Sequence, residues 1–70
     1  MGEAMVFLFD KECKITDFDK ILIFKNDIIS IKLKKKTLKI NGEFLKLTYF
    51  SKEELVIKGV INMVKFKYEN

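Results

Sequence analysis

The sequence predicts a small single-domain all-β protein, an antiparallel β-meander of about six short strands that curls into a sheet or partial barrel. Apolar and polar residues alternate strictly over residues 29–34, which is typical of a strand with one buried face. The aliphatic segment that begins at Leu38 recurs 17 residues later at Leu55, and glycine interrupts both copies at the same point, at Gly42 and Gly59. Repetition of short alternating segments favours several strands over helices.

Each expected element follows from the local pattern. The apolar run at residues 5–9 predicts either a strand or the start of a helix, because periodicity cannot decide over five residues. Residues 15–19 are expected to form a connector that contains a turn. The remaining apolar stretches predict strands at residues 21–24, 29–33, 38–40, 45–49, 55–57 and 60–66.

Besides a turn at residues 34–36 and a polar connection at residues 51–54, turn residues are expected at three places between these strands. They are Asn26 with Asp27, Asn41 with Gly42, and Lys58 with Gly59. The last two pairs predict two-residue hairpins, because glycine tolerates the positive φ angles of such turns. Leu38 would then lie opposite Leu45, and Leu55 opposite Asn62.

The same hairpins fix the expected faces of the strand at residues 45–49. Leu45, Leu47 and Tyr49 would face the core, and Phe44 would lie on a second, partly covered face. The repeat also leaves a short β-solenoid open as an alternative, because a fixed period near twenty residues is typical of stacked coils.

Length and composition limit the classes of function. The 70 residues allow one domain, and without proline and with three glycines no linker is visible. The sequence contains no histidine and a single cysteine, Cys13, which excludes the usual zinc sites, an intrachain disulfide and cysteine–histidine catalysis. Cys13 is expected to be an inert apolar residue, and the adjacent Glu53 and Glu54 to lie in a solvated turn. The sequence therefore predicts no enzyme and no cofactor.

The net charge of +4 comes from fourteen lysines against ten acidic residues, and arginine is absent. Arginine is the residue that best reads guanine edges and grips phosphates, so its absence argues against sequence-specific nucleic-acid binding. Lysines concentrate between Asp27 and Glu43, a stretch without acidic residues. This candidate partner-binding cluster consists of Lys32, Lys34, Lys35, Lys36 and Lys39.

Two explanations of the lysine cluster stay open at this point. Lysines are an ordinary means of keeping an exposed strand from pairing edge to edge. Alternatively, they could contact an acidic partner or an anionic membrane surface. No run is long enough to span a membrane, and the apolar segment at residues 5–9 lacks the features of a signal peptide, so we expect a cytoplasmic protein with no transmembrane segment of its own.

The segment from Ile15 to Phe66 resembles the YabP/YqfC family of sporulation proteins of endospore-forming bacteria. The matching features are residues 24–31 with their turn, the pattern Leu38-x-Ile40-x-Gly42-x-x-Leu45, and Glu53-Glu54-Leu55-x-Ile57-x-Gly59-x-Ile61-x-x-Val64-x-Phe66. Lys36 departs from the family, which often carries glycine shortly before this strand. On this basis residues 15–67 form the family-like core, and residues 1–14 form an N-terminal segment without an assigned structure.

The resemblance implies a non-enzymatic protein of spore morphogenesis, engaged in coat or cortex assembly. It also implies a polytopic membrane protein of the spore envelope as partner, and a peripheral location at the forespore membrane or spore coat. We therefore expect an interaction module that docks to such a protein or to copies of itself. The competing hypothesis is a small basic β-barrel that binds nucleic acid, which only size and positive charge favour.

Overall fold

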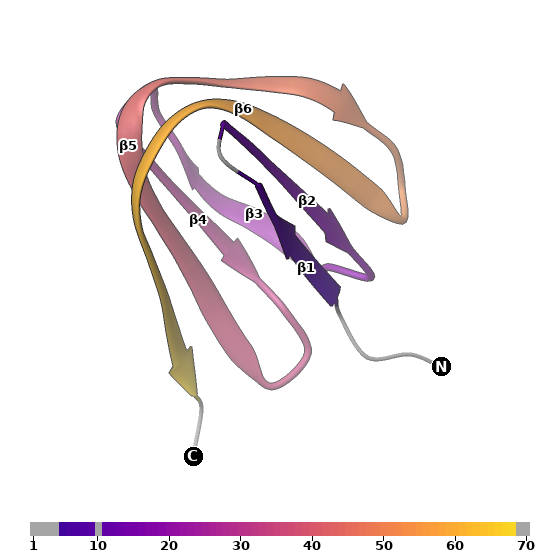
Figure 1. Cartoon of the computed structure of the whole chain (residues 1–70). Helices are drawn as coiled ribbons and strands as arrows, with labels where there is room; N and C mark the ends of the chain where they lie inside the picture. The colour runs from indigo at the N-terminus through magenta and orange to yellow at the C-terminus, as the bar shows by residue number, and fades with distance from the viewer. Residues whose placement is uncertain (1–4, 10, 69–70) are drawn as a thin grey trace.

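The computed structural model describes residues 5–9 and 11–68, which form six β-strands and no helix (Figure 1). Within these ranges there is accordingly no helix that could cross a membrane. Four of the strands are short and two have 15 residues each. The strands are β1 (Met5–Leu8), β2 (Glu12–Thr16), β3 (Lys20–Phe24), β4 (Ile28–Lys32), β5 (Lys36–Phe50) and β6 (Glu54–Tyr68).

All six strands belong to one antiparallel sheet with the order β1-β2-β6-β5-β4-β3. This confirms the prediction of a small antiparallel all-β domain with about six strands. Parallel stacking of coils, the solenoid alternative, does not occur in this sheet. Two details differ from a chain of short hairpins: β5 and β6 are long, and β6 lies between β2 and β5, so the chain crosses from β2 to β3 at the far edge.

The two glycine hairpins predicted from the sequence are wrong. Gly42 lies inside β5 and Gly59 inside β6, and both strands continue through them. Leu38 therefore pairs with Phe66 rather than Leu45, and Leu55 pairs with Phe50 rather than Asn62. The real turn between β5 and β6 lies at residues 51–53, whereas Asn26 and Asp27 do lie in the short connection between β3 and β4.

Both long strands bend (Figure 1), and Gly42 and Gly59 lie inside these strands where their pairing is irregular. The register between β5 and β6 shifts between Asn41 and Gly42 and again between Glu43 and Lys46, so the pairing is bulged there. A side chain at Gly42 would collide with the carbonyl oxygen of Val60. The φ of Gly59 is +145°, and a Cβ there would lie 2.6 Å from the carbonyl oxygen of Phe44. Close approach of two backbones explains both glycines.

The bends divide the sheet into two halves with matching topology. The β1–β2 half contains β1, β2, residues 54–58 of β6 and residues 46–50 of β5; the β3–β4 half contains β3, β4, residues 36–41 of β5 and residues 63–68 of β6. The tip of each hairpin contacts one bend, since the Gly42 amide donates to the Asp27 carbonyl at 3.0 Å and the Gly59 amide donates to the Lys11 carbonyl at 3.1 Å. The two copies of the sequence repeat, which begin at Leu38 and Leu55, therefore lie at equivalent positions in the two halves of the sheet.

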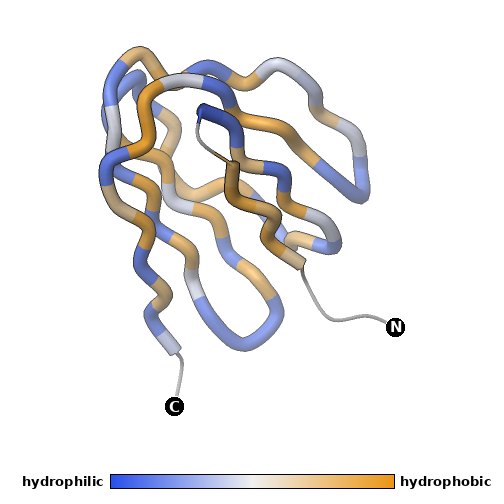
Figure 2. The backbone as a smooth tube through the Cα atoms, viewed as in Figure 1, coloured by the Kyte–Doolittle hydropathy of each residue, from blue (hydrophilic) through white to orange (hydrophobic). Residues whose placement is uncertain are grey.

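The core lies between the two halves, on the inner face of the bent sheet. Ile15 pairs with Leu55 in one half as Ile31 pairs with Leu38 in the other. Figure 2 shows apolar and polar segments alternating along the strands, as burial of one face requires. The fully buried apolar side chains are Cys13, Ile15, Ile29, Ile31, Leu33, Leu38, Ile40, Leu55 and Ile57, with Leu45 nearly so.

Three further expectations need correction. Ile15 belongs to strand β2 and not to a connector, because it pairs with Val6 on one side and Leu55 on the other. Tyr49 faces outward and is half exposed, since a register shift between Leu47 and Tyr49 reverses the alternation. Phe44 is 71% exposed rather than covered, and its φ of 56° marks it as part of the bulge.

Candidate functional site

The predicted lysine cluster divides between two faces of the molecule. Lys32 and Lys39 lie on the outer face of the β3–β4 half, and Lys34 and Lys35 are exposed in the turn between β4 and β5. Lys36 lies opposite Tyr68. This pair is two residues along the strands from the inward pair of Leu38 and Phe66, so it lies on the same inner face. Its Nζ is 4.5 Å from the centre of the Phe66 ring and 5.5 Å from that of Tyr68. The Lys36 ammonium therefore interacts with aromatic faces instead of extending the cluster.

The sheet brings three further lysines to the same outer face. Lys20 lies opposite Lys32 across β3 and β4, and Lys65 lies opposite Lys39 across β5 and β6. Lys67 pairs with Thr37, which in turn pairs with Lys32, so it belongs to the first of these rows. We call this surface the lysine face. It consists of Lys20, Lys32, Lys39, Lys65 and Lys67, with Ile23, Ser30 and Thr37 between them.

The lysine face carries like charges in direct opposition. Residues directly opposite each other in an antiparallel pair have side chains about 5 Å apart, and like charges there are destabilising. Lys39 does not protect a sheet edge, because β5 is hydrogen-bonded there to β4 on one side and to β6 on the other. Edge protection therefore does not explain the loss of stability from the opposed charges at Lys39. The two rows contain no carboxylate, and Asp19 and Asp27 lie in the connections at the ends of β3 and β4.

The outer face of the β1–β2 half has a different charge pattern. Lys14 lies 3.6 Å from Glu54, and Lys58 lies 3.9 Å from Glu12, so carboxylates neutralise these lysines. A neighbouring row across β1, β2, β6 and β5 is mainly apolar and consists of Phe7, Lys14, Val56 and Tyr49. This face contributes apolar contact area, and two carboxylates offset most of the positive charge of its three lysines, Lys14, Lys46 and Lys58.

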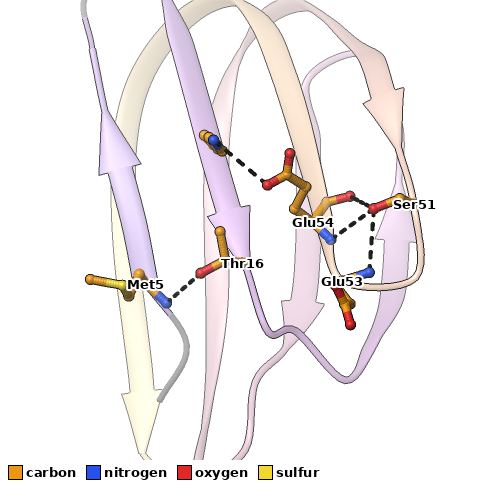
Figure 3. A network of polar contacts seen from close by, with 6 residues as sticks. Met5, Thr16, Ser51, Glu53 and Glu54 are labelled. Carbon is orange, nitrogen blue, oxygen red and sulfur yellow. Dashed lines mark hydrogen bonds and ion pairs between the residues drawn. The ribbon is translucent and has the colours of Figure 1, made fainter. Parts of the chain in front are cut away.

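The turn between β5 and β6 is held by hydrogen bonds around Ser51 (Figure 3). The Ser51 amide donates to the Glu54 carbonyl at 2.8 Å, and its hydroxyl accepts from the amides of Glu53 and Glu54 at 3.3 and 3.2 Å. Glu53 is exposed in this turn, and Glu54 pairs with Lys14. The two adjacent carboxylates therefore have structural surroundings and do not converge on one site.

The two outer edges of the sheet also differ. Strand β1 is followed by Phe9, and the segment from Met5 to Phe9 contains no charged residue, although Met5, Leu8 and Phe9 are 55%, 52% and 58% exposed. Strand β3 begins at Lys20 and is followed by Lys25, and the register shift between Ile21 and Ile23 gives it a bulge. Charges and bulges at an edge oppose pairing with another chain, so β1 is the unprotected edge.

Cys13 has no feature of a reactive thiol. Its side chain is fully buried in the core, and burial raises the pKa of the thiol from 9.0 to about 11. The thiolate, which is the nucleophile and metal ligand, is therefore scarce at neutral pH. Over residues 5–9 and 11–68, no three acidic or cysteine side chains are grouped in a way that could hold a metal ion.

Comparison with known families gives one result. The model of the YabP family matches residues 3–70, which is nearly the whole chain. The match extends beyond the segment that resembles the family in sequence and includes the unprotected strand β1. Neither curated proteins nor solved structures gave a match.

Proposed function

Because the chain belongs to the YabP family, whose membership indicates a sporulation-related role, we propose that it is a non-enzymatic protein of spore morphogenesis. In this proposal it acts in coat or cortex assembly, and it binds a polytopic membrane protein of the spore envelope. It is located peripherally, at the forespore membrane or in the spore coat. The observation that carries the binding function is the exposed, uncharged edge of β1.

The free side of β1 can accept another strand. The Phe9 amide donates to the Glu12 carbonyl at 2.8 Å, so this pair is hydrogen-bonded across the β1–β2 hairpin. Hydrogen-bonded and non-hydrogen-bonded pairs alternate in antiparallel strands, which directs the backbone groups of Val6 and Leu8 away from β2. These groups are suited to a partner segment in extended conformation, which would add a seventh strand to the sheet.

Exposed apolar side chains would strengthen such an addition. Leu8 lies on the inner side of β1, beside the core residue Cys13, whereas Met5 and Phe7 lie on the outer side. A strand laid along β1 would therefore contact apolar groups on both faces. We commit to an extended, mainly apolar segment of the membrane protein as the occupant, because no charge of β1 selects for a charged partner.

The test replaces Leu8 with lysine in the native host. Leu8→Lys places a charge on the unprotected edge and should prevent strand addition. Leu22→Lys is the matched control, because Leu22 is 47% exposed on the bulged edge strand β3. The readouts are the titre of heat-resistant spores and co-purification with a membrane protein identified by mass spectrometry. We expect Leu8→Lys to lose both, and Leu22→Lys to retain both.

Three results would contradict the proposal. A strain that lacks the protein could form heat-resistant spores normally. Leu8→Lys could retain its membrane partner while circular dichroism shows a folded protein. Sedimentation could also show that Leu8→Lys dissociates a dimer of the wild type without any effect on the membrane partner, which would assign the β1 edge to a second copy of the chain.

A further inference from the structure

We propose that the lysine face binds the headgroup surface of an anionic lipid bilayer. Four lysines at the centre of this face form two opposed pairs on neighbouring rows, Lys20 with Lys32 and Lys39 with Lys65. Lys67 extends the first row on β6, and four strands together contribute the five positive charges. A bilayer is the extended anionic surface that can approach all of them at once.

The loss of stability that opposed like charges cause in the sheet supports a binding role for these lysines. A sheet gains stability from opposite charges in cross-strand pairs and loses it from like charges. The β1–β2 half supplies carboxylates beside its lysines, at 3.6 Å from Lys14 and 3.9 Å from Lys58. The lysine face has none in its two rows. An external anionic surface would supply a counter-charge for the opposed pair of Lys39 and Lys65.

The neighbouring side chains favour lipid over nucleic acid. Ile23 lies in the row of Lys39, and Met63 lies in the next row along β6; they are 42% and 46% exposed. Short apolar side chains beside lysines can enter the headgroup region while the ammonium groups remain at phosphate level. Binding of single-stranded nucleic acid would instead use aromatic rings for base stacking, and the rows of the lysine face contain no aromatic residue.

The expected affinity follows from the number of lysines. Each lysine close to an anionic leaflet changes the partition coefficient about fivefold at physiological ionic strength. Loss of two lysines should therefore weaken binding about 25-fold, and reversal of both charges should weaken it further. Binding should also fall steeply with added salt, because all the lysines of this face except the half-buried Lys32 are solvent-exposed.

The chain offers a matched pair of variants. Lys39→Glu with Lys65→Glu reverses an opposed lysine pair of β5 and β6 on the lysine face. Lys46→Glu with Lys58→Glu reverses an opposed pair of the same two strands on the other half. Each reversal changes the charge by two, so both double variants have a net charge of zero instead of +4. Only the location of the change differs.

The measurement is co-sedimentation with vesicles that contain 30% phosphatidylglycerol in phosphatidylcholine, at physiological ionic strength. We expect wild type to bind these vesicles and not pure phosphatidylcholine. The first double variant should lose at least 25-fold in partitioning, and the second should stay within about threefold of wild type. Circular dichroism checks the fold, and Lys39→Gln with Lys65→Gln, which removes the pair without new charges, repeats the test if the glutamate variant is unfolded.

Each other outcome overturns the proposal. Equal loss in both double variants would mean that net charge alone attracts the protein to membranes. Tighter binding to a single-stranded oligonucleotide than to vesicles at the same ionic strength would assign the face to nucleic acid. Absence of binding to anionic vesicles would leave an acidic protein as its partner. The vesicles contain no protein, so this result is independent of whether β1 binds a membrane protein.

Discussion

The two halves of the sheet share a topology and a core but present different outer surfaces. Cys13 and Ile15 of β2 correspond to Ile29 and Ile31 of β4, and all four are fully buried. On the outside, the β1–β2 half places carboxylates beside Lys14 and Lys58, although Lys46 lies opposite Lys58, whereas the two lysine rows of the β3–β4 half contain no carboxylate. Packing requires the inner faces to remain alike, and it leaves the outer faces free to differ. We therefore look for function in the differences between the halves.

The edges follow the same division. The β1–β2 half ends in the uncharged strand β1, and the β3–β4 half ends in the bulged strand β3 between Lys20 and Lys25. In the two proposals above, one half binds a protein segment at its strand edge and the other binds an anionic surface with its charged face. A small domain with both could bind a membrane protein and the surrounding lipid together.

Replacement of the bend glycines should have the largest effect. Gly59→Ala places a Cβ 2.6 Å from the Phe44 carbonyl oxygen at a φ of +145°, and Gly42→Ala forces the Val60 carbonyl to move. Backbone strain and overpacking together should cost about 3–5 kcal/mol. A domain of this size has about 4–10 kcal/mol in total, so each variant should lose a large part of its free energy of unfolding.

Urea denaturation followed by circular dichroism measures this loss. Gly2→Ala, at a glycine outside the described residues, controls for the substitution itself. If Gly59→Ala lost less than about 1 kcal/mol, the bend of β6 would not press against Phe44. Unequal losses at Gly42 and Gly59 would show that the two bends are not equivalent despite the matching sequence around them.

These glycines also show what the sequence could predict. The repeat around Leu38 and Leu55, the alternation of faces and the antiparallel sheet follow from local pattern and are confirmed. The continuation of the strands through Gly42 and Gly59 was not predictable from local preference, because Asn41-Gly42 suits a hairpin equally well. Pairing along 15-residue strands leaves Leu38 and Ile40 fully buried in the core between the two halves of the sheet. The free energy gained from this long-range pairing and burial outweighs the local preference for a turn.

The candidate surfaces illustrate the same limit. The alternation of apolar and polar residues pointed to Lys32 and Lys39 as outward side chains of the sheet, and the structure places both there. Lys20 and Lys65 could not be added, because only the strand order places them opposite these two. Lys36 could not be removed, because its contact with Phe66 depends on the pairing of β5 with the end of β6. Charge runs in a sequence show only one strand of a surface that a sheet assembles from four.

The thiol of Cys13 provides a test of intermediate size, because the equivalent position in the other half is Ile29. Burial raises the pKa of Cys13 from 9.0 to about 11, so the folded state holds its proton where the unfolded state loses it. The associated stability is fully present below pH 9 and is lost as the pH rises through 11. The loss should reach about 2–3 kcal/mol relative to a variant without the thiol.

Cys13→Val, which approaches the isoleucine of the other half, is that variant. Urea denaturation of both proteins between pH 7 and 11 measures the difference, and every other titrating group is common to both. We expect the stability of wild type to fall relative to Cys13→Val only above pH 9. A constant difference across this range, or rapid alkylation of native wild type at pH 7, would show that the Cys13 thiol reaches solvent.

The smallest expected change in stability concerns the opposed lysine pairs, and measuring it at both pairs compares the two outer faces directly. Lys39→Glu should stabilise the domain, because it converts repulsion across β5 and β6 into attraction toward Lys65. Exposed cross-strand pairs of this kind contribute about 0.2–1 kcal/mol. Lys46→Glu makes the same change opposite Lys58, but Lys58 already has Glu12 within 3.9 Å, so the gain there should be smaller. Thermal unfolding at low salt and at 1 M NaCl measures both gains, which should disappear at high salt because the Debye length falls to about 3 Å.

Equal gains at both sites would mean that the carboxylates of the β1–β2 half do not neutralise its lysines. If Lys39→Glu brought no gain at low salt, the pair would impose no cost, and the charge argument for an external anionic surface on the β3–β4 half would fail.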